Sequence, residues 1–274
     1  MYVNSGHQAT STTLNVGGSQ FINEGGSATS TTVNGGYQTV YSGGSVTNTT
    51  INTGGTQNIS GGSVTDTTLN DGGEQNVESG GVAANTVINS GGTQKVNSGG
   101  SVTNTTINTG GTQNISGGSV TDTTLNDGGE QNVESGGVVA NTVINSGGTQ
   151  KVNSGGSVTN TTINTGGTQN ISGGSVTDTT LNDGGEQNVE SGGVAVNTVI
   201  NSGGTQKVNS GGSVTDTTIN SGGGQYVYVN GNVTKTTITD GGILQVDAGG
   251  SASQVTQNSG GAIITNTSAV LSGT

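Results

Sequence analysis

The sequence predicts an all-β fold, a parallel β-helix of about fourteen coils with 18 or 19 residues in each coil. Three observations lead to this prediction. A unit with the pattern T-x-[ILV]-N-x-G-G-x-Q-x-[VI]-x-x-G-G recurs along the chain, its apolar positions alternate with polar ones, and paired glycines separate the alternating segments. Because the length of the unit varies only at the glycine turns, we expect successive copies to lie one over another in register.

The repeat is most regular between residues 45 and 212. Residues 45–100 contain units of 18, 19 and 19 residues, and this 56-residue block recurs at 101–156 and 157–212. We therefore interpret residues 1–274 as a single β-helical repeat domain. One polar position marks the register at steps of 18 or 19 residues, and it is occupied by Asn15, Asn34, Asn52, Asn70, Asn89, Asn108, Asn126, Asn145, Asn164, Asn182, Asn201, Asn220, Thr239 and Asn258.

Two short strands are expected in each unit. Thr67-x-Leu69 and Gln75-x-Val77 alternate with polar residues, which is typical of strands that bury one face. We expect these four residues and their equivalents to face the interior, where stacked glutamine side chains can hydrogen-bond along the axis and satisfy their amides.

The last coils support an inward glutamine column, because Leu244 and Ile263 occupy the same position there. The asparagines equivalent to Asn70 are expected to stabilise a turn or to bond to the coil above. By the same alternation, the outward positions of the unit are Asp66, Thr68, Asn70, Glu74 and Asn76.

Composition excludes several functional classes. The net charge is −12, arginine is absent, and three of the four lysines are copies of one repeat position, so the chain lacks the clustered cations that nucleic-acid binding requires. The chain contains no cysteine, and its one histidine is His7. Almost every carboxylate between residues 45 and 212 is triplicated, whereas an active site needs a unique constellation. We therefore predict no catalytic residues and no cofactor.

Asp71, Glu74 and Glu78 lie beside glycine pairs and are candidate ligands for calcium. The calcium-binding nonapeptide pattern is not present, and these acids recur only in every third coil. Spacing the acids in this way keeps like charges from stacking directly, which would destabilise a sheet. The sequence therefore predicts no metal site.

An ice-binding β-helix is a remote alternative, because pairs such as Thr65-x-Thr67 resemble threonine arrays. That function needs a flat and regular outward array, but Thr67 shares the inward parity of Leu69. In other coils Ala84 and Val196 replace Thr65 and interrupt its row.

Serines around the second glycine pair are the main surface feature of the repeat. A turn serine is ordinarily a solvated residue that makes local hydrogen bonds, and this interpretation stays open beside a functional one. The serines that precede the glycine pair are Ser42, Ser60, Ser79, Ser98, Ser116, Ser135, Ser154, Ser172, Ser191 and Ser210. The serines that follow it are Ser45, Ser63, Ser101, Ser119, Ser157, Ser175 and Ser213.

The unit INSGGTQKVNSGGSVTDTTINSGG resembles the passenger repeats of self-associating autotransporter adhesins of the AIDA and TibA group, and the resemblance covers essentially all 274 residues. It implies a right-handed β-helix on the Gram-negative cell surface that promotes adhesion to host cells, aggregation and biofilm formation. The signal peptide and translocator barrel of that family are expected outside these residues, so we expect the chain to be a fragment of a larger passenger.

The resemblance also implies that a cytoplasmic heptosyltransferase O-glycosylates the repeats before export, which makes the seventeen turn serines candidate acceptors. The partners that it implies are this enzyme, the host cell surface and a second rod of the same kind, held by side-by-side contacts. The alternative is a purely structural surface stalk. The monotony of the surface favours the stalk, and the resemblance favours the adhesin.

Overall fold

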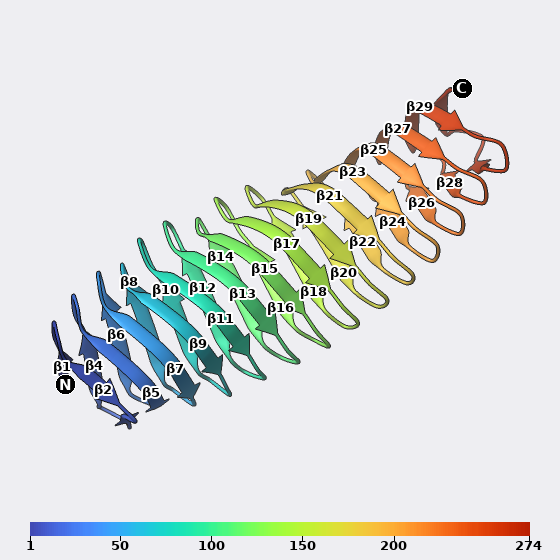
Figure 1. Cartoon of the computed structure of the whole chain (residues 1–274). Helices are drawn as coiled ribbons and strands as arrows, with labels where there is room; N and C mark the ends of the chain where they lie inside the picture. The colour runs from blue at the N-terminus through green and yellow to red at the C-terminus, as the bar shows by residue number, and fades with distance from the viewer. The chain divides into compact units, whose positions relative to one another are not determined.

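The structure is a computed structural model that describes residues 1–274 and contains β-strands and turns but no helix. The chain divides into two compact units, Met1–Val139 and Ala140–Thr274, which we describe separately. In each unit the strands form two parallel sheets, named sheet A and sheet B, which the chain visits in alternation (Figure 1). One circuit through both sheets is one coil, and strand β17 (Val138–Ile144) of sheet B crosses the boundary between the units.

In the first unit, sheet A contains β1 (Tyr2–Val3), β4 (Ser19–Ile22), β6 (Tyr37–Tyr41), β8 (Thr56–Ser60), β10 (Glu74–Val77), β12 (Thr93–Asn97), β14 (Thr112–Ser116) and β16 (Glu130–Val133). Sheet B contains β2 (Gln8–Thr10), β3 (Thr13–Leu14), β5 (Ser27–Asn34), β7 (Ser45–Asn52), β9 (Ser63–Leu69), β11 (Val82–Ile88), β13 (Ser101–Ile107) and β15 (Ser119–Leu125).

In the second unit, sheet A contains β18 (Thr149–Asn153), β20 (Thr168–Ser172), β22 (Glu186–Val189), β24 (Thr205–Val208), β26 (Gly224–Val227), β28 (Ile243–Val246) and β30 (Ala262–Thr265). Sheet B contains β19 (Ser157–Ile163), β21 (Ser175–Leu181), β23 (Val194–Ile200), β25 (Ser213–Ile219), β27 (Asn232–Ile238), β29 (Ser251–Gln257) and β31 (Val270–Gly273).

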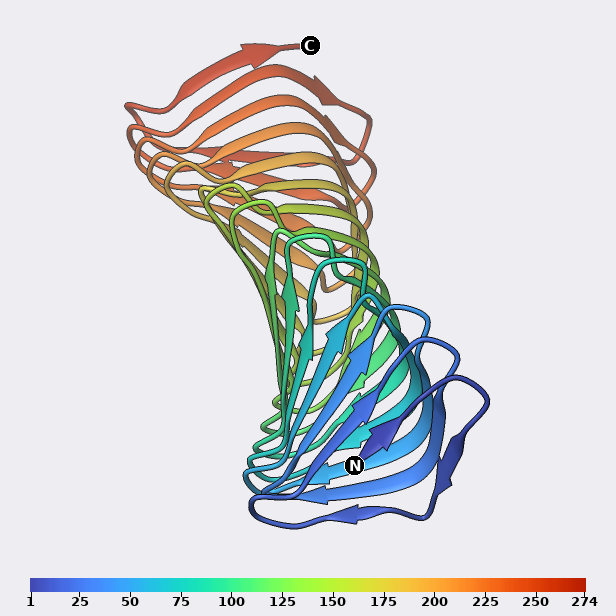
Figure 2. The same ribbon diagram turned by 90° about the vertical axis from the view of Figure 1, so that its left-hand side faces the viewer.

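The coils stack in parallel and in register. Within sheet A, Gln75 pairs with Gln57 of the coil before it and with Gln94 of the coil after it, so each repeat position lies against its own copy. Figure 2 shows strands of one sheet running in the same direction within each unit. The predicted parallel β-helix is therefore confirmed, and the varying unit length is absorbed in the turns.

A column of buried glutamines links the coils through the interior. Gln113 is fully buried, and its Nε2 donates to Oε1 of Gln94 over 2.6 Å. Its own Oε1 accepts from Nε2 of Gln131 over 2.7 Å. Each glutamine amide donates to one neighbour and accepts from the other. The hydrogen-bonding groups of the column are therefore satisfied within a core that excludes water. The predicted inward orientation of the glutamines is confirmed.

A second ladder runs along the ends of the sheet B strands. Nδ2 of Asn70 donates to Oδ1 of Asn52 over 2.9 Å, and Asn89 donates in the same way to Asn70 over 3.0 Å. These side chains are half-buried, so the ladder lies at the edge of the interior rather than inside it. The expected bond from each asparagine to the neighbouring coil is confirmed.

The sheet B strands are longer than expected and contain a bend that the alternation did not reveal. Asp66 lies in the middle of β9 with φ 57°, in the left-handed region, and its side chain is exposed. This single residue inverts the alternation, so that Val64 is buried in addition to Thr67 and Leu69. Thr65 is only half-buried as a result. The core therefore has one more apolar column than the unit pattern predicts.

The paired glycines of the turns have different physical roles. In the turn that begins at Asn70, Gly72 adopts φ +69°, a conformation that costs a residue with a Cβ atom about 1–2 kcal/mol. Gly73 has no such φ, but a Cβ at that position would lie 2.5 Å from the carbonyl oxygen of Ile51 in the preceding coil. The first glycine therefore makes the turn possible, and the second allows the coils to approach.

We predict that Gln113→Ala destabilises the protein by about 2–4 kcal/mol, because the substitution leaves a cavity and removes one partner from each of two buried amides. Asn114→Ala, on the outward side of the same strand, is the matched control and should cost about 1 kcal/mol or less. Urea unfolding followed by circular dichroism measures both. Equal losses for the two variants would contradict a structural role for the interior column.

Candidate functional site

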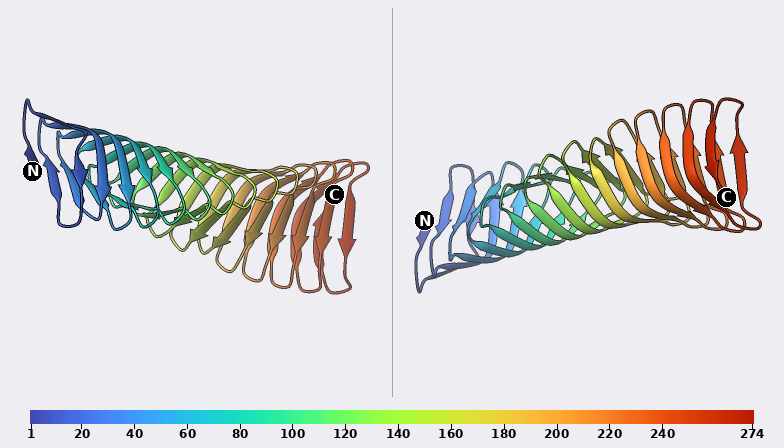
Figure 3. Two further views of the ribbon diagram at one scale, coloured as in Figure 1. Left: turned by 90° about the horizontal axis from the view of Figure 1, so that it is seen from below. Right: turned by 90° about the horizontal axis from the view of Figure 1, so that it is seen from above.

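The candidate serines lie in the turns that connect each sheet A strand to the following sheet B strand, which we call the serine turns. The turns of successive coils form rows along the edges of each unit (Figure 3). In one serine turn, the N–H of Gly81 donates to the carbonyl oxygen of Glu78 over 2.8 Å, and Gly80 has φ +73°. Ser79 is the second residue of this four-residue turn and therefore lies at its tip.

All ten serines that precede the glycine pair are exposed, but they occupy two different positions. Seven lie at turn tips and are Ser42, Ser79, Ser98, Ser135, Ser154, Ser191 and Ser210. In the shorter turns the chain has one residue fewer, and Ser116 is the last residue of β14, opposite Asn97 of β12. Ser60 and Ser172 end β8 and β20 in the same way. The sequence pattern groups these serines together, whereas the structure divides them.

The seven serines that follow the glycine pair begin sheet B strands. Four of them, Ser45, Ser63, Ser119 and Ser175, are exposed, and three, Ser101, Ser157 and Ser213, are half-buried. The three half-buried residues share one repeat position with Ser45, which is exposed, so the position alone does not decide the exposure.

Glycines of the following coil lie beside the tip serines. A Cβ on Gly99 would lie 2.9 Å from Oγ of Ser79, and a Cβ on Gly117 would lie 3.2 Å from Cβ of Ser98. A residue with a side chain at these glycines would therefore crowd the serine. With glycine there, the space around each hydroxyl remains open to a substituent.

The pattern missed five further serines that precede a glycine pair and have the same turn geometry. In the turn that begins at Asn89, the N–H of Gly92 donates to the carbonyl oxygen of Asn89 over 2.9 Å, which places Ser90 at the tip. The tripeptide S-G-G marks this turn in the sequence, but the predicted acceptor serines lie only at the second glycine pair of each unit. The five exposed serines are Ser90, Ser146, Ser202, Ser221 and Ser259.

The outer face of sheet A carries ion pairs between neighbouring coils. Nζ of Lys95 lies 2.7 Å from Oε2 of Glu74, whose other carboxylate oxygen accepts from Asn76 over 2.8 Å. The Lys95 hydrogen bond lowers the pKa of Glu74 below its usual value of 4.5, against the opposing effect of burial. Both side chains remain partly exposed, so the pair is screened by solvent and contributes little free energy.

The outer face of sheet B has two half-buried rows that contain Thr65 and Thr68. Ala84 and Val87 replace these two threonines in the next coil, and Thr67 is buried as expected. The rows are therefore uncharged, and every third coil in them carries apolar side chains.

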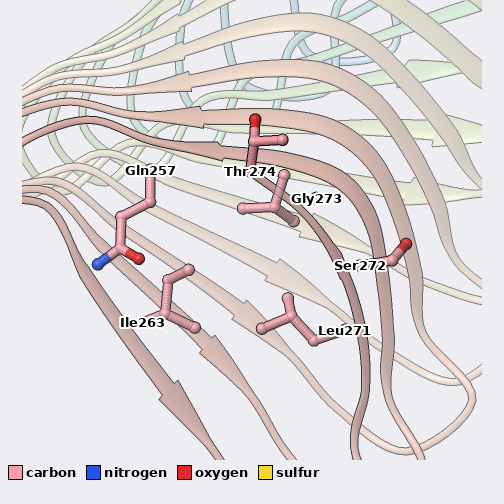
Figure 4. Close-up of a pocket in the computed structure, with 7 residues that line it drawn as sticks. Gln257, Ile263, Leu271, Ser272, Gly273 and Thr274 are labelled. Atoms are coloured by element: carbon pink, nitrogen blue, oxygen red, sulfur yellow. The ribbon is translucent and has the colours of Figure 1, made fainter.

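A cavity at the last coil is lined by Val255, Gln257, Ile263, Leu271 and residues 272–274 (Figure 4). Ile263 pairs with Leu244 and so continues the glutamine column of the interior. The cavity is thus the inner side of the last coil rather than a separate site, and its lining contains no acidic or basic side chain. No group of three or more histidine, aspartate or glutamate side chains is arranged to hold a metal ion, and no helix of the chain could span a membrane.

The chain is similar to known proteins along its whole length. The family model for the AIDA adhesin of the bacterial autotransporter system, described as a probable stalk, matches residues 58–111, 166–223 and 191–242. The crystal structure of a TibA fragment, described as hyper-glycosylated by TibC catalysis, has 55% sequence identity and a TM-score of 0.94. That similarity covers 97% of this chain and 99% of the TibA chain.

Two other solved structures are much less similar. The Dettilon tailspike protein has 12% identity and a TM-score of 0.34, over 98% of this chain and 63% of that chain. An alginate lyase from Paenibacillus sp. has 11% identity and a TM-score of 0.27, over 86% of this chain and 93% of that chain. These values support no argument about fold or function. No curated protein matches the chain.

We predict that Glu74→Gln lowers the free energy of unfolding by about 0.2–1 kcal/mol at neutral pH. The folded-state pKa of Glu74 is lowered, so its stabilisation is present above the usual value of 4.5 and is lost as the pH falls through the folded-state pKa. Unfolding titrations across the acidic range should show the free energies of unfolding of the variant and the parent protein becoming equal as the pH falls. A double-mutant cycle with Lys95→Met isolates the pair, and a coupling energy of zero would contradict the assigned cause.

Proposed function

Because the chain belongs to the AIDA and TibA group of autotransporter adhesin passengers, we propose that it is a cell-surface adhesive module that carries O-linked heptose on its turn serines. In this proposal residues 1–274 act as one repeat domain that is a substrate of a heptosyltransferase and performs no catalysis itself. The observation that carries the proposal is the row of exposed serines at the turn tips.

The turn geometry explains why these serines suit modification. The backbone of each long serine turn is already held by its own hydrogen bond, such as the 2.8 Å bond from Gly81 to Glu78, so a sugar on Ser79 disturbs no bond of the turn. The neighbouring Gly99 leaves room beside the hydroxyl. A hydrophilic substituent therefore adds to the surface without a cost to the core.

TibA supports the modifying partner, since its solved fragment is described as glycosylated by TibC. Its chain is 55% identical to this one over nearly all of both chains. We infer that an enzyme of the same kind modifies this chain in the cytoplasm, before export to the outer surface of the cell.

Adhesion and self-association follow from the repetition of weak polar contacts. The outer face of sheet B offers uncharged rows that contain Thr65 and Thr68, and the same contacts recur in later coils. Many weak contacts at one spacing give strong binding when they act together, because the second contact is effectively intramolecular. The host cell surface and a second copy of the module are the proposed partners. A stalk without contacts of its own remains the second candidate, because the 56-residue blocks present nearly the same surface three times.

We predict that co-expression with a heptosyltransferase adds sugar to the tip serines, to be mapped by intact mass and by peptide mass spectrometry. Ser98→Ala should remove one attached sugar. Ser253→Ala is the matched control, since the Ser253 hydroxyl lies 3.2 Å from that of Thr234 and is half-buried in a strand. An unmodified mass at all seventeen candidate serines would remove the glycosylation proposal.

We also predict that the purified module sediments with an average mass that rises with concentration, because rods that pair side by side gain many contacts at once. Sedimentation velocity, measured with and without the attached sugar, tests this directly. A monomer at every concentration in both forms would reject self-association and favour the stalk.

A further inference from the structure

Strand β26 departs from the repeat at both of its outward positions on sheet A. In β26, orange in Figure 1, Gly224 occupies the position that Thr205 fills in the coil before it and Ile243 fills in the coil after it. Tyr226, two residues further on, occupies the position of Lys207 in the preceding coil. Both departures fall in a single strand.

The two departures fit each other sterically. The Tyr226 ring lies over Gly224, so that a Cβ at this glycine would lie 2.9 Å from Cε2 and 3.0 Å from Oη of the ring. A threonine or an isoleucine, as in the neighbouring coils, would push the ring away. Gly224 is accordingly buried, whereas Thr205 and Ile243 are half-buried. The glycine thus allows the tyrosine ring to lie down on the sheet.

Three other aromatic rings of the chain stack on one another. Tyr2 and Phe21 stack with ring centroids 4.9 Å apart, and Phe21 and Tyr41 stack at 6.5 Å. Those rings cover one another. Tyr226 instead lies against Gly224 and is half-buried on the outer face of the sheet.

Polar groups lie beside the half-buried Tyr226 ring. Tyr228 occupies the next outward position after Tyr226. On one side, Nε2 of Gln245 donates to Oδ1 of Asp247 over 2.9 Å, and Gln245 is the Cα partner of Tyr226. On the other side, the ammonium group of Lys207 is paired with Glu186, so it offers no free positive charge. The surface therefore combines a flat apolar ring with amide and carboxylate groups that bind hydroxyls.

We propose that Tyr226 is the platform of a carbohydrate-binding site for neutral hexopyranose glycans. The face of an aromatic ring carries partial negative charge and attracts the C–H groups on the flat side of a pyranose ring. The sugar hydroxyls then bond to Gln245 and Asp247. Anionic polymers are disfavoured, because the net charge of the chain is −12 and Lys207 is already neutralised.

This inference names the class of ligand that the adhesive surface binds. It rests on the proposed function only in assuming that the chain meets such a glycan at the cell surface. The test uses the whole chain purified without any glycosyltransferase, so it is independent of the occupancy of the serines. The chain has no tryptophan and five tyrosines, so tyrosine fluorescence reports on the site. Cellohexaose, maltohexaose and mannohexaose serve as probes, with saturation-transfer NMR as the second readout.

We expect saturable binding of at least one of these three probes. Tyr226→Ala and Gly224→Thr should each weaken it about tenfold, the effect of losing one ring-stacking contact. Gly224→Thr keeps the tyrosine and restores the residue of the preceding coil, so its fold is expected to be intact, as circular dichroism can check. Tyr37→Ala, which removes a 51% exposed ring from the same sheet, is the matched control and should bind as the parent does. Absence of saturable binding by the parent chain, or parent-like binding by both Tyr226→Ala and Gly224→Thr, would overturn the proposal.

Discussion

The hydrogen-bonded column of buried glutamines is the constraint on which the rest of the structure depends. An amide buried without partners would cost free energy, and here each amide bonds to the same residue of the coils before and after it, with buried threonine hydroxyls such as that of Thr105 as additional partners. Any slip of one residue between coils would break the column and would turn the apolar columns towards solvent. The column therefore sets the register, and the register places every surface residue.

The register also fixes the conformation of the turns, and the turns present the candidate acceptor serines. Gly73 and its equivalents must lack a side chain because a carbonyl oxygen of the preceding coil lies too close. The same close stacking brings Gly99 beside Ser79 and leaves the serine at the tip exposed. Features that suit the serines for modification are thus consequences of the tight spacing between coils. A module of this kind can lose or gain one turn residue, as at Ser116, without disturbing its interior.

Much of the fold could be predicted from the sequence, because the repeat superposes residues that the structure pairs. The inward glutamine column was predictable, since Leu244 and Ile263 share its position. The burial of Val64 was not, because Asp66 inverts the alternation through its left-handed backbone. Asparagine or aspartate stands at that position in most coils, and these residues tolerate this conformation better than others, so a signal was present.

The surface was less predictable than the core for a similar reason. Ser79 and Ser116 both directly precede a glycine pair, so the sequence does not distinguish them. The turn at Ser116 is one residue shorter, however, and Ser116 is therefore the last residue of a strand. The contact between Lys95 and Glu74 joins residues 21 positions apart and runs diagonally between coils, so it requires the register as well as the repeat length. The Tyr226 ring on Gly224 depends on a side-chain conformation that no repeat pattern specifies.

Engineered cysteines test the central claim of in-register stacking most directly, because the natural chain has none. Val87 and Thr106 are Cα partners on the outer face of sheet B, whereas Thr103 pairs with Ala84 instead. In-register neighbours in adjacent strands lie about 4.8 Å apart, within the range that a disulfide spans. The variant Val87→Cys/Thr106→Cys should oxidise to an intramolecular disulfide, seen by mass after thiol alkylation, and Val87→Cys/Thr103→Cys should keep free thiols. Equal oxidation of the two variants, or oxidation of the second alone, would contradict the register and the account built on it.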